Sequence, residues 1–118
     1  TLSLHDALPI LILTDGGTAS ASEVVTGALK DYNAAVTVGT TTFGKGVVQL
    51  PFELKSGIGG LKVTVSKYYT PKGEDINKKG IIPDYEVKLT EEDVNKDYSK
   101  DTDPQLQKGI EVIKDMIK

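Results

Sequence analysis

The sequence predicts an α/β fold. Leu11–Thr14 is a short apolar run that ends at a glycine turn, and apolar side chains recur at helical spacing over residues 20–31. A second short segment, Ala35–Val38, is rich in β-branched residues and closes at Gly39. A strand, a helix and a strand in this order predict a parallel pair of strands joined by the helix.

The composition of the chain excludes several classes of function. The 118 residues are 38% hydrophobic and 26% charged, which fits one small globular unit or part of a larger one. With 14 basic and 17 acidic side chains the net charge is −3, so the chain lacks the basic surface that binds nucleic acid. The absence of cysteine excludes disulfides and a thiol nucleophile. The longest apolar run, Ala7–Leu13, is far shorter than the roughly 20 residues of a membrane helix.

Residues 1–10, TLSLHDALPI, can be translated in frame from a widely used sequencing adapter oligonucleotide. We therefore expect a non-native adapter-derived segment here and exclude it from the fold. His5, the single histidine of the chain, lies in this segment and is not a candidate site residue. The alternative is a genuine lead-in to the first strand.

The first predicted helix begins close to a glycine turn. Asp15-Gly16-Gly17 follows the first strand, and a turn of this kind favours glycine. Ser20 and Glu23 then have the S-x-x-E spacing of a capping box. We predict a helix from about Ser20 to Asp31, whose apolar positions are Val24, Val25, Ala28 and Leu29.

A β-hairpin is predicted after the second strand. Val47–Leu54 and Leu61–Tyr69 are β-rich and are separated by the glycine-rich residues 56–60. Apolar and polar side chains alternate along the second arm, so we expect one dry and one wet face. The apolar set is Leu61, Val63 and Val65.

The C-terminal part is predicted to end in an amphipathic helix. A last short strand is expected at Tyr85–Leu89, and Thr90–Thr102 is charged and expected to be irregular. Asp103 and Pro104 form a favourable N-cap and first helical position. The apolar side of the helix is expected to consist of Leu106, Ile110, Ile113 and Ile117.

Ser20 is the first candidate for chemistry. At a helix N-terminus the free backbone N–H groups carry partial positive charge, and they can stabilise an oxyanion formed beside an attacking serine. Serine is also among the preferred N-cap residues. From this segment alone, Ser20 is either a nucleophile or only a cap.

Lys45 is the second candidate. Gly44 and Gly46 flank it, and both allow the backbone to pack closely while the lysine side chain points at one target. To act as a general base its amine must be neutral near pH 7, a state that burial favours. Gln49 lies on the same side of an extended strand by period-2 counting, and its amide could orient the amine. A solvated loop lysine is the alternative.

The segment Gly39–Lys45 also fits the first seven positions of a phosphate-binding P-loop. The eighth position is Gly46, where a P-loop needs Ser or Thr to ligate Mg²⁺. Residues 47–50 favour a strand over the helix that would bind phosphate at its N-terminus. Nucleotide binding is therefore disfavoured.

Taken together, the ordered motifs of the chain resemble the carboxyl-terminal processing (tail-specific) proteases, S41-type serine peptidases. The resemblance spans about Leu11 to Val87, and Asp103–Leu106 is similar to the closing helix of the family. It implies the C-terminal half of a catalytic domain with an incomplete ClpP/crotonase-like αβ core over residues 11–90, followed by a charged linker and helix over 91–118. The motifs are GGTASASE at 16–23, TFGKG at 42–46, VQ at 48–49, YYTP at 68–71, Gly73 and GIIPD at 80–84.

The resemblance also implies roles for single residues. Ser20 would be the nucleophile, Lys45 its general base and Gln49 the support of the lysine, and the 25-residue separation of Ser20 from Lys45 selects Ser20 over Ser22. The backbone N–H of Ala21 would contribute to the oxyanion hole. No metal or other cofactor is implied.

The family resemblance implies that the substrates are the polypeptide chains of exported proteins. It also implies that the full-length protein has an extracytoplasmic location. It also implies parts that this sequence does not contain, namely an upstream oxyanion-hole loop and a PDZ-like substrate-recognition domain. We therefore expect the 118-residue chain alone to be inactive and the full-length parent to be a serine endopeptidase. A non-catalytic ligand-binding or scaffold module of the same fold is the main alternative.

Overall fold

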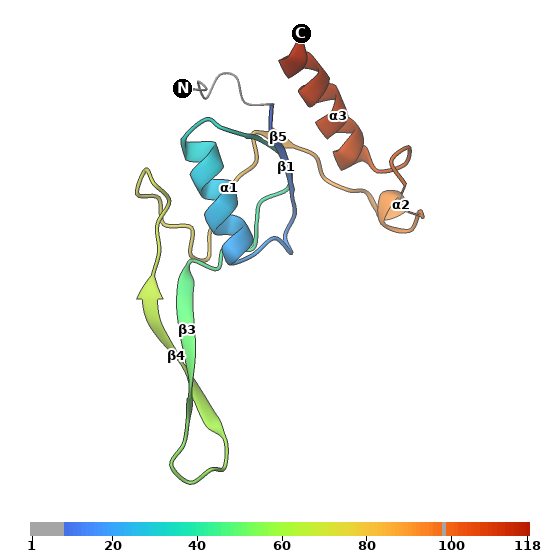
Figure 1. Ribbon diagram of the computed structural model, residues 1–118. Helices are drawn as coiled ribbons and strands as arrows, with labels where there is room; N and C mark the ends of the chain where they lie inside the picture. The colour runs from blue at the N-terminus through green and yellow to red at the C-terminus, as the bar shows by residue number, and fades with distance from the viewer. Residues whose placement is uncertain (1–8, 98) are drawn as a thin grey trace.

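The computed structural model describes residues 9–97 and 99–118 and confirms the α/β class (Figure 1). The first predicted strand, helix and second strand are present, and the hairpin and C-terminal helix follow. In chain order the elements are β1 (Leu11–Thr14), α1 (Ala21–Asp31), β2 (Val36–Gly39), β3 (Val47–Glu53), β4 (Gly60–Lys67), β5 (Tyr85–Glu86), α2 (Glu91–Val94) and α3 (Pro104–Ile117).

A three-stranded parallel sheet in the order β1-β2-β5 forms the centre of the chain. The predicted parallel pairing of the first two strands is confirmed, with Leu11 opposite Val36. Figure 1 shows α1 and α3 on opposite sides of these strands. Gly109 of α3 lies against the sheet so closely that an added Cβ would be 3.0 Å from Leu11 Cδ2. The fully buried Val38 of β2 lies in this core.

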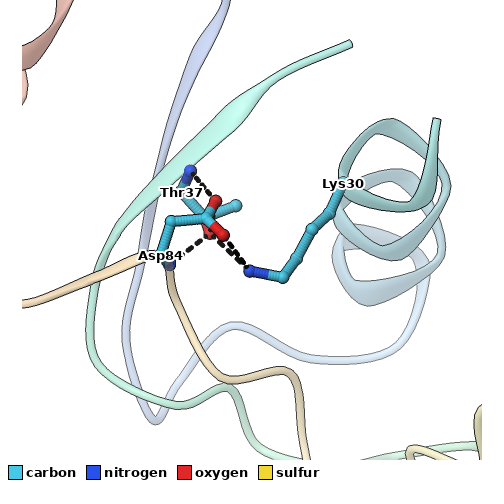
Figure 2. A network of polar contacts seen from close by, with 3 residues as sticks. All are labelled: Lys30, Thr37 and Asp84. Atoms are coloured by element: carbon cyan, nitrogen blue, oxygen red, sulfur yellow. Dashed lines mark hydrogen bonds and ion pairs between the residues drawn. The ribbon is translucent and has the colours of Figure 1, made fainter. Parts of the chain in front are cut away.

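A polar network fixes β5 to the rest of the sheet (Figure 2). The Asp84 carboxylate accepts hydrogen bonds from Thr37 N–H at 2.9 Å and Thr37 Oγ1 at 2.8 Å, and it forms an ion pair with Lys30 of α1. In return, Asp84 N–H donates to Thr37 Oγ1 at 2.9 Å. Burial raises the pKa of Asp84, but the hydrogen bonds from Lys30 and Thr37 bring it below its ordinary value. The GIIPD motif thus holds the third strand in register.

The hairpin is present, but the expectation of one dry face is wrong. All residues of β4 are exposed, and Leu61 and Val65 expose 56% and 46% of their surface. Figure 1 shows β3 and β4 extending away from the parallel sheet. Alternation of apolar and polar residues predicts the two faces of a strand correctly, but a face becomes dry only when another element packs on it.

The C-terminal region differs from the sequence expectation in three ways. The last strand is shorter than predicted, and Glu91–Val94 forms a short helix capped by Thr90 where irregular structure was expected. The buried residues of α3 are Gly109 and Val112, whereas Ile110 and Ile117 are exposed. A small residue on the helix lets it approach the sheet, so the buried side of α3 is centred on glycine.

The N-cap and first position of α3 are as predicted. Asp103 accepts hydrogen bonds from the N–H groups of Gln105 and Leu106, at 2.9 and 3.1 Å, and Pro104 begins the helix. No helix in the described ranges is long and apolar enough to span a membrane.

The expected adapter-derived segment lies mostly outside the described residues, since these begin at residue 9. Ile10 is within them, and its carbonyl oxygen accepts a hydrogen bond from Val36 N–H at 3.0 Å. Pairing with β2 therefore extends one residue into the segment that we excluded.

Candidate active site

The candidate nucleophile follows a tight turn at the end of β1. Asp15 Oδ1 accepts hydrogen bonds from the N–H groups of Gly17 and Thr18, both at 2.9 Å, which closes the turn. Thr18 in turn accepts a hydrogen bond through its carbonyl oxygen from Phe43 N–H at 2.9 Å. The turn thus brings the start of α1 against the segment that contains Lys45.

Ser20 is the N-cap of α1 and has an unusual backbone conformation, with φ 59° and ψ −118°. A positive φ in a residue with a side chain costs about 1–3 kcal/mol and persists only where the surroundings enforce it. Ser20 N–H donates to Glu23 Oε2 at 2.9 Å, and the Ser20 carbonyl oxygen accepts from Glu23 N–H at 2.9 Å. The capping-box spacing of the sequence is thus realised, with Glu23 N–H bonded to the Ser20 carbonyl oxygen while the half-buried hydroxyl makes no capping hydrogen bond.

Glu23 joins the two candidate segments. Its side chain is fully buried, and its Oε1 accepts hydrogen bonds from Thr42 Oγ1 at 2.6 Å and Gly44 N–H at 2.7 Å. Its Oε2 accepts from Ser20 N–H and also from Lys45 N–H, the latter at 2.8 Å. One carboxylate oxygen therefore holds the main chains of Ser20 and Lys45 next to each other.

The protonation of Glu23 follows from these contacts. Burial raises the pKa of the carboxyl group, but hydrogen bonds from Thr42, Lys45, Gly44 and Ser20 lower it, and the net result lies below the ordinary value of 4.5. Glu23 is therefore a carboxylate at neutral pH, with four donors on two oxygens.

Lys45 lies in a loop that requires glycine on both sides. Gly44 has φ 85°, and an added Cβ would lie 2.8 Å from Gly80 N; at Gly46 an added Cβ would lie 2.8 Å from Asn77 N. The predicted close packing of the backbone at both glycines is therefore present. Lys45 as a whole residue is half-buried, and its carbonyl oxygen accepts a hydrogen bond from the Tyr68 hydroxyl.

Gln49 is placed on β3, next to an irregularity in the pairing with β4 at Val48/Gln49. Its amide Nε2 donates to Thr64 Oγ1 across the hairpin at 3.2 Å. Within residues 9–97 and 99–118 no hydrogen bond joins Gln49 to Lys45. The structure thus brings the main chains of Ser20 and Lys45 together through Glu23. The pairing of the Ser20 hydroxyl with the Lys45 amine and the support of Lys45 by Gln49 stay predictions.

Ala21, the predicted oxyanion-hole residue, is the first residue of α1. The N–H groups of the first helical turn have no partner inside the helix, and the exposed Ala21 N–H has no acceptor among the described residues. The contribution of this N–H group to an oxyanion hole stays a prediction.

The sequence did not predict that Glu23 links the Ser20 and Lys45 segments, nor that Tyr68 contacts both of them. The S-x-x-E spacing marked Glu23 only as a cap, and its additional bonds to Thr42, Gly44 and Lys45 depend on the tertiary fold. Tyr68 was part of a motif, but no local pattern indicates that its hydroxyl reaches the carbonyl oxygens of Ser20 and Lys45.

The phosphate-binding alternative finds little support in the geometry. The loop after Gly39 leads into β3, so Lys45 lacks the following helix that a P-loop needs to bind phosphate. In the part of the chain that the structure describes, no group of three His, Cys, Asp or Glu side chains could hold a metal ion.

Comparison with known proteins points to one class of enzyme. The profile of peptidase family S41 matches residues 3–87. The chain is 46% identical over 110 residues to a carboxyl-terminal-processing protease of a Picosynechococcus species, covering 93% of this chain and 26% of that protein. It is 48% identical over 85 residues to a chloroplastic C-terminal processing peptidase of Tetradesmus obliquus, covering 72% of this chain and 18% of that protein.

A solved structure agrees with these relatives. The photosystem II D1 C-terminal processing protease is 49% identical and superposes with a TM-score of 0.64, covering 70% of this chain and 21% of that chain. The chain therefore spans only about a fifth to a quarter of the length of these relatives.

Proposed function

Because this chain belongs to peptidase family S41, whose members are serine peptidases, we propose that it contributes a Ser20/Lys45 catalytic dyad to a longer serine endopeptidase. The observation that carries the proposal is the shared carboxylate oxygen: Glu23 Oε2 accepts from both Ser20 N–H and Lys45 N–H. The strained φ of 59° at Ser20 supports the same residue as nucleophile, because such strain is concentrated at active sites.

In the proposed mechanism, the neutral Lys45 amine takes the hydroxyl proton of Ser20 as Oγ attacks a peptide carbonyl carbon. The developing oxyanion is stabilised by Ala21 N–H at the positive end of α1. Collapse of the tetrahedral species transfers the proton to the leaving amine and leaves an acyl-enzyme on Ser20. Lys45 then deprotonates a water molecule that releases the acyl group. In this mechanism Gln49 orients the Lys45 amine.

The proposals for substrate and location rest on the family and not on side chains of this chain. We propose that the full-length protein cleaves polypeptide chains of exported proteins in an extracytoplasmic compartment, and that it binds them with a PDZ-like domain outside this segment. One relative is named as chloroplastic, so members of the family do act in an organelle. We further propose that the 118-residue chain alone is inactive, because the family resemblance implies a second oxyanion-hole donor in a part of the protein outside these residues.

The proposal predicts that the full-length protein cleaves a denatured, unstructured polypeptide in the presence of EDTA and without nucleotide. The reason is that a serine–lysine mechanism needs neither a metal nor ATP. Cleavage is measured by the appearance of new amino termini, and Mg·ATP binding is measured in parallel by calorimetry. The 118-residue chain is assayed in parallel and is expected to show no cleavage.

Absence of cleavage by the full-length protein would favour the non-catalytic scaffold module. Tight Mg·ATP binding would instead support phosphate binding by the Gly39–Lys45 loop. Cleavage by the 118-residue chain would contradict the need for upstream parts.

A further inference from the structure

Tyr68 follows β4 and makes three contacts with the candidate active site. Its backbone N–H donates to the Gly46 carbonyl oxygen at 3.0 Å. Its hydroxyl donates to the carbonyl oxygen of Lys45 and lies 3.3 Å from the carbonyl oxygen of Ser20. Tyr68 thus contacts both segments of the dyad from a third part of the chain, 23 residues after Lys45 and 48 residues after Ser20.

The contacts of Tyr68 complement those of Glu23. Glu23 accepts from the N–H groups of Ser20 and Lys45, whereas the Tyr68 hydroxyl is directed at the carbonyl oxygens of the same two residues. A residue held at both its N–H and its C=O has little freedom in φ and ψ, and the position and direction of its Cα–Cβ bond are therefore fixed. This restraint is needed most at Ser20, whose positive φ is unfavourable without support.

The Tyr68 hydroxyl stays protonated at neutral pH and can therefore donate a hydrogen bond. Burial raises its pKa, and the negative charge of Glu23 raises it further. A phenol has one proton to donate, and the two carbonyl oxygens share it. The ring itself is half-buried, so removal of the hydroxyl alone leaves the packing of the ring in place.

We propose that Tyr68 is a positioning residue that sets the distance between the Ser20 hydroxyl and the Lys45 amine through their carbonyl oxygens. This inference rests on the proposed Ser20/Lys45 dyad. Tyr68 takes no part in proton transfer, because its hydroxyl bonds to main-chain oxygens of the dyad. Its loss therefore lowers the rate of the chemical step and leaves substrate affinity unchanged.

The test is Tyr68→Phe in the full-length protein, assayed on an unstructured polypeptide. We expect kcat to fall about 10- to 100-fold, since a misplacement of about 1 Å can cost 10²-fold, while KM changes less than about twofold. Tyr69→Phe is the matched control, because Tyr69 is 55% exposed and its hydroxyl makes no hydrogen bond to another described residue. Its kcat should equal that of the wild type.

A Tyr68→Phe variant that keeps kcat within about twofold of the wild type would overturn the inference, as would an equal loss in Tyr69→Phe. If the wild type itself shows no cleavage, the proposed function fails, and crystal structures of wild type and Tyr68→Phe decide the geometric claim. A displacement of the Lys45 main chain relative to Ser20 by more than about 0.5 Å supports positioning by Tyr68. Superimposable main chains at Ser20 and Lys45 contradict it.

Discussion

Replacement of Ser20 by alanine is expected to reduce peptide-bond cleavage by the full-length protein by a factor of at least about 10⁴, since loss of a serine nucleophile removes the covalent route entirely. The fold should survive, because the contacts of Ser20 to Glu23 use main-chain atoms that alanine retains. Cleavage of an unstructured polypeptide and amide hydrogen exchange of α1 measure the two effects separately.

Ser22→Ala is the matched control for this change. Ser22 is two residues further along, is exposed and lies in regular helix, and its contact with Thr26 uses the Ser22 carbonyl oxygen. Because we propose Ser20 and not Ser22 as the nucleophile, Ser22→Ala should cleave at the wild-type rate. A reversal of the two results would move the nucleophile to Ser22 and remove the argument based on the strained φ of Ser20.

The second large effect is expected at Glu23. Glu23→Gln keeps the shape of the side chain but replaces one acceptor oxygen by an NH₂ group that faces donors. Of the four groups that bond to the carboxylate, only the Thr42 hydroxyl can also accept, so at least one backbone N–H group is left without a partner in either orientation of the amide. We expect a loss of about 3 kcal/mol in the free energy of opening of α1. Native-state hydrogen exchange of the α1 amides measures it.

The pH dependence follows from the direction of the pKa shift. The pKa of Glu23 is lower in the folded state than its ordinary value of 4.5, so the ionised form favours folding. This contribution is present in full above the unfolded pKa and is lost as the pH falls through the folded pKa. The stability difference between wild type and Glu23→Gln should therefore be constant near neutral pH and shrink below about pH 4.5.

Glu111→Gln provides the control for a change of carboxylate to amide. Glu111 forms an ion pair with Lys108 at 3.0 Å on the surface of α3, and 62% of its side chain is exposed. Its replacement should change stability by less than about 0.5 kcal/mol. A Glu23→Gln variant as stable as Glu111→Gln would show that the buried carboxylate does not hold the two segments together.

The sequence predicted the elements whose signals are local. The glycine turn after β1, the capping spacing at Ser20 and the Asp103–Pro104 start of α3 each depend on residues close together in the chain, and each is present. The glycines around Lys45 were also interpreted correctly, since a close approach of backbone leaves no room for a Cβ at Gly44 or Gly46.

The remaining features depend on tertiary contacts. Leu61 alternates with polar residues but is exposed, because no other element within the described residues packs on this face of the hairpin. The sequence of a strand does not indicate which element will cover it. Gly109 was not part of the predicted apolar side of α3, yet its lack of a side chain lets α3 approach Leu11. Glu23 was recognised as a cap but not as an acceptor for Lys45 N–H, a contact between residues 22 positions apart.

The most direct test of the account is to treat the full-length protein with a fluorophosphonate and to map the label by mass spectrometry in wild type and Lys45→Arg. A neutral lysine activates serine, whereas arginine stays protonated and cannot act as a base. We expect the label on Ser20 in the wild type, at a rate reduced at least about 10²-fold in Lys45→Arg. A label on another residue, or equal labelling of Ser20 in both proteins, would contradict the dyad.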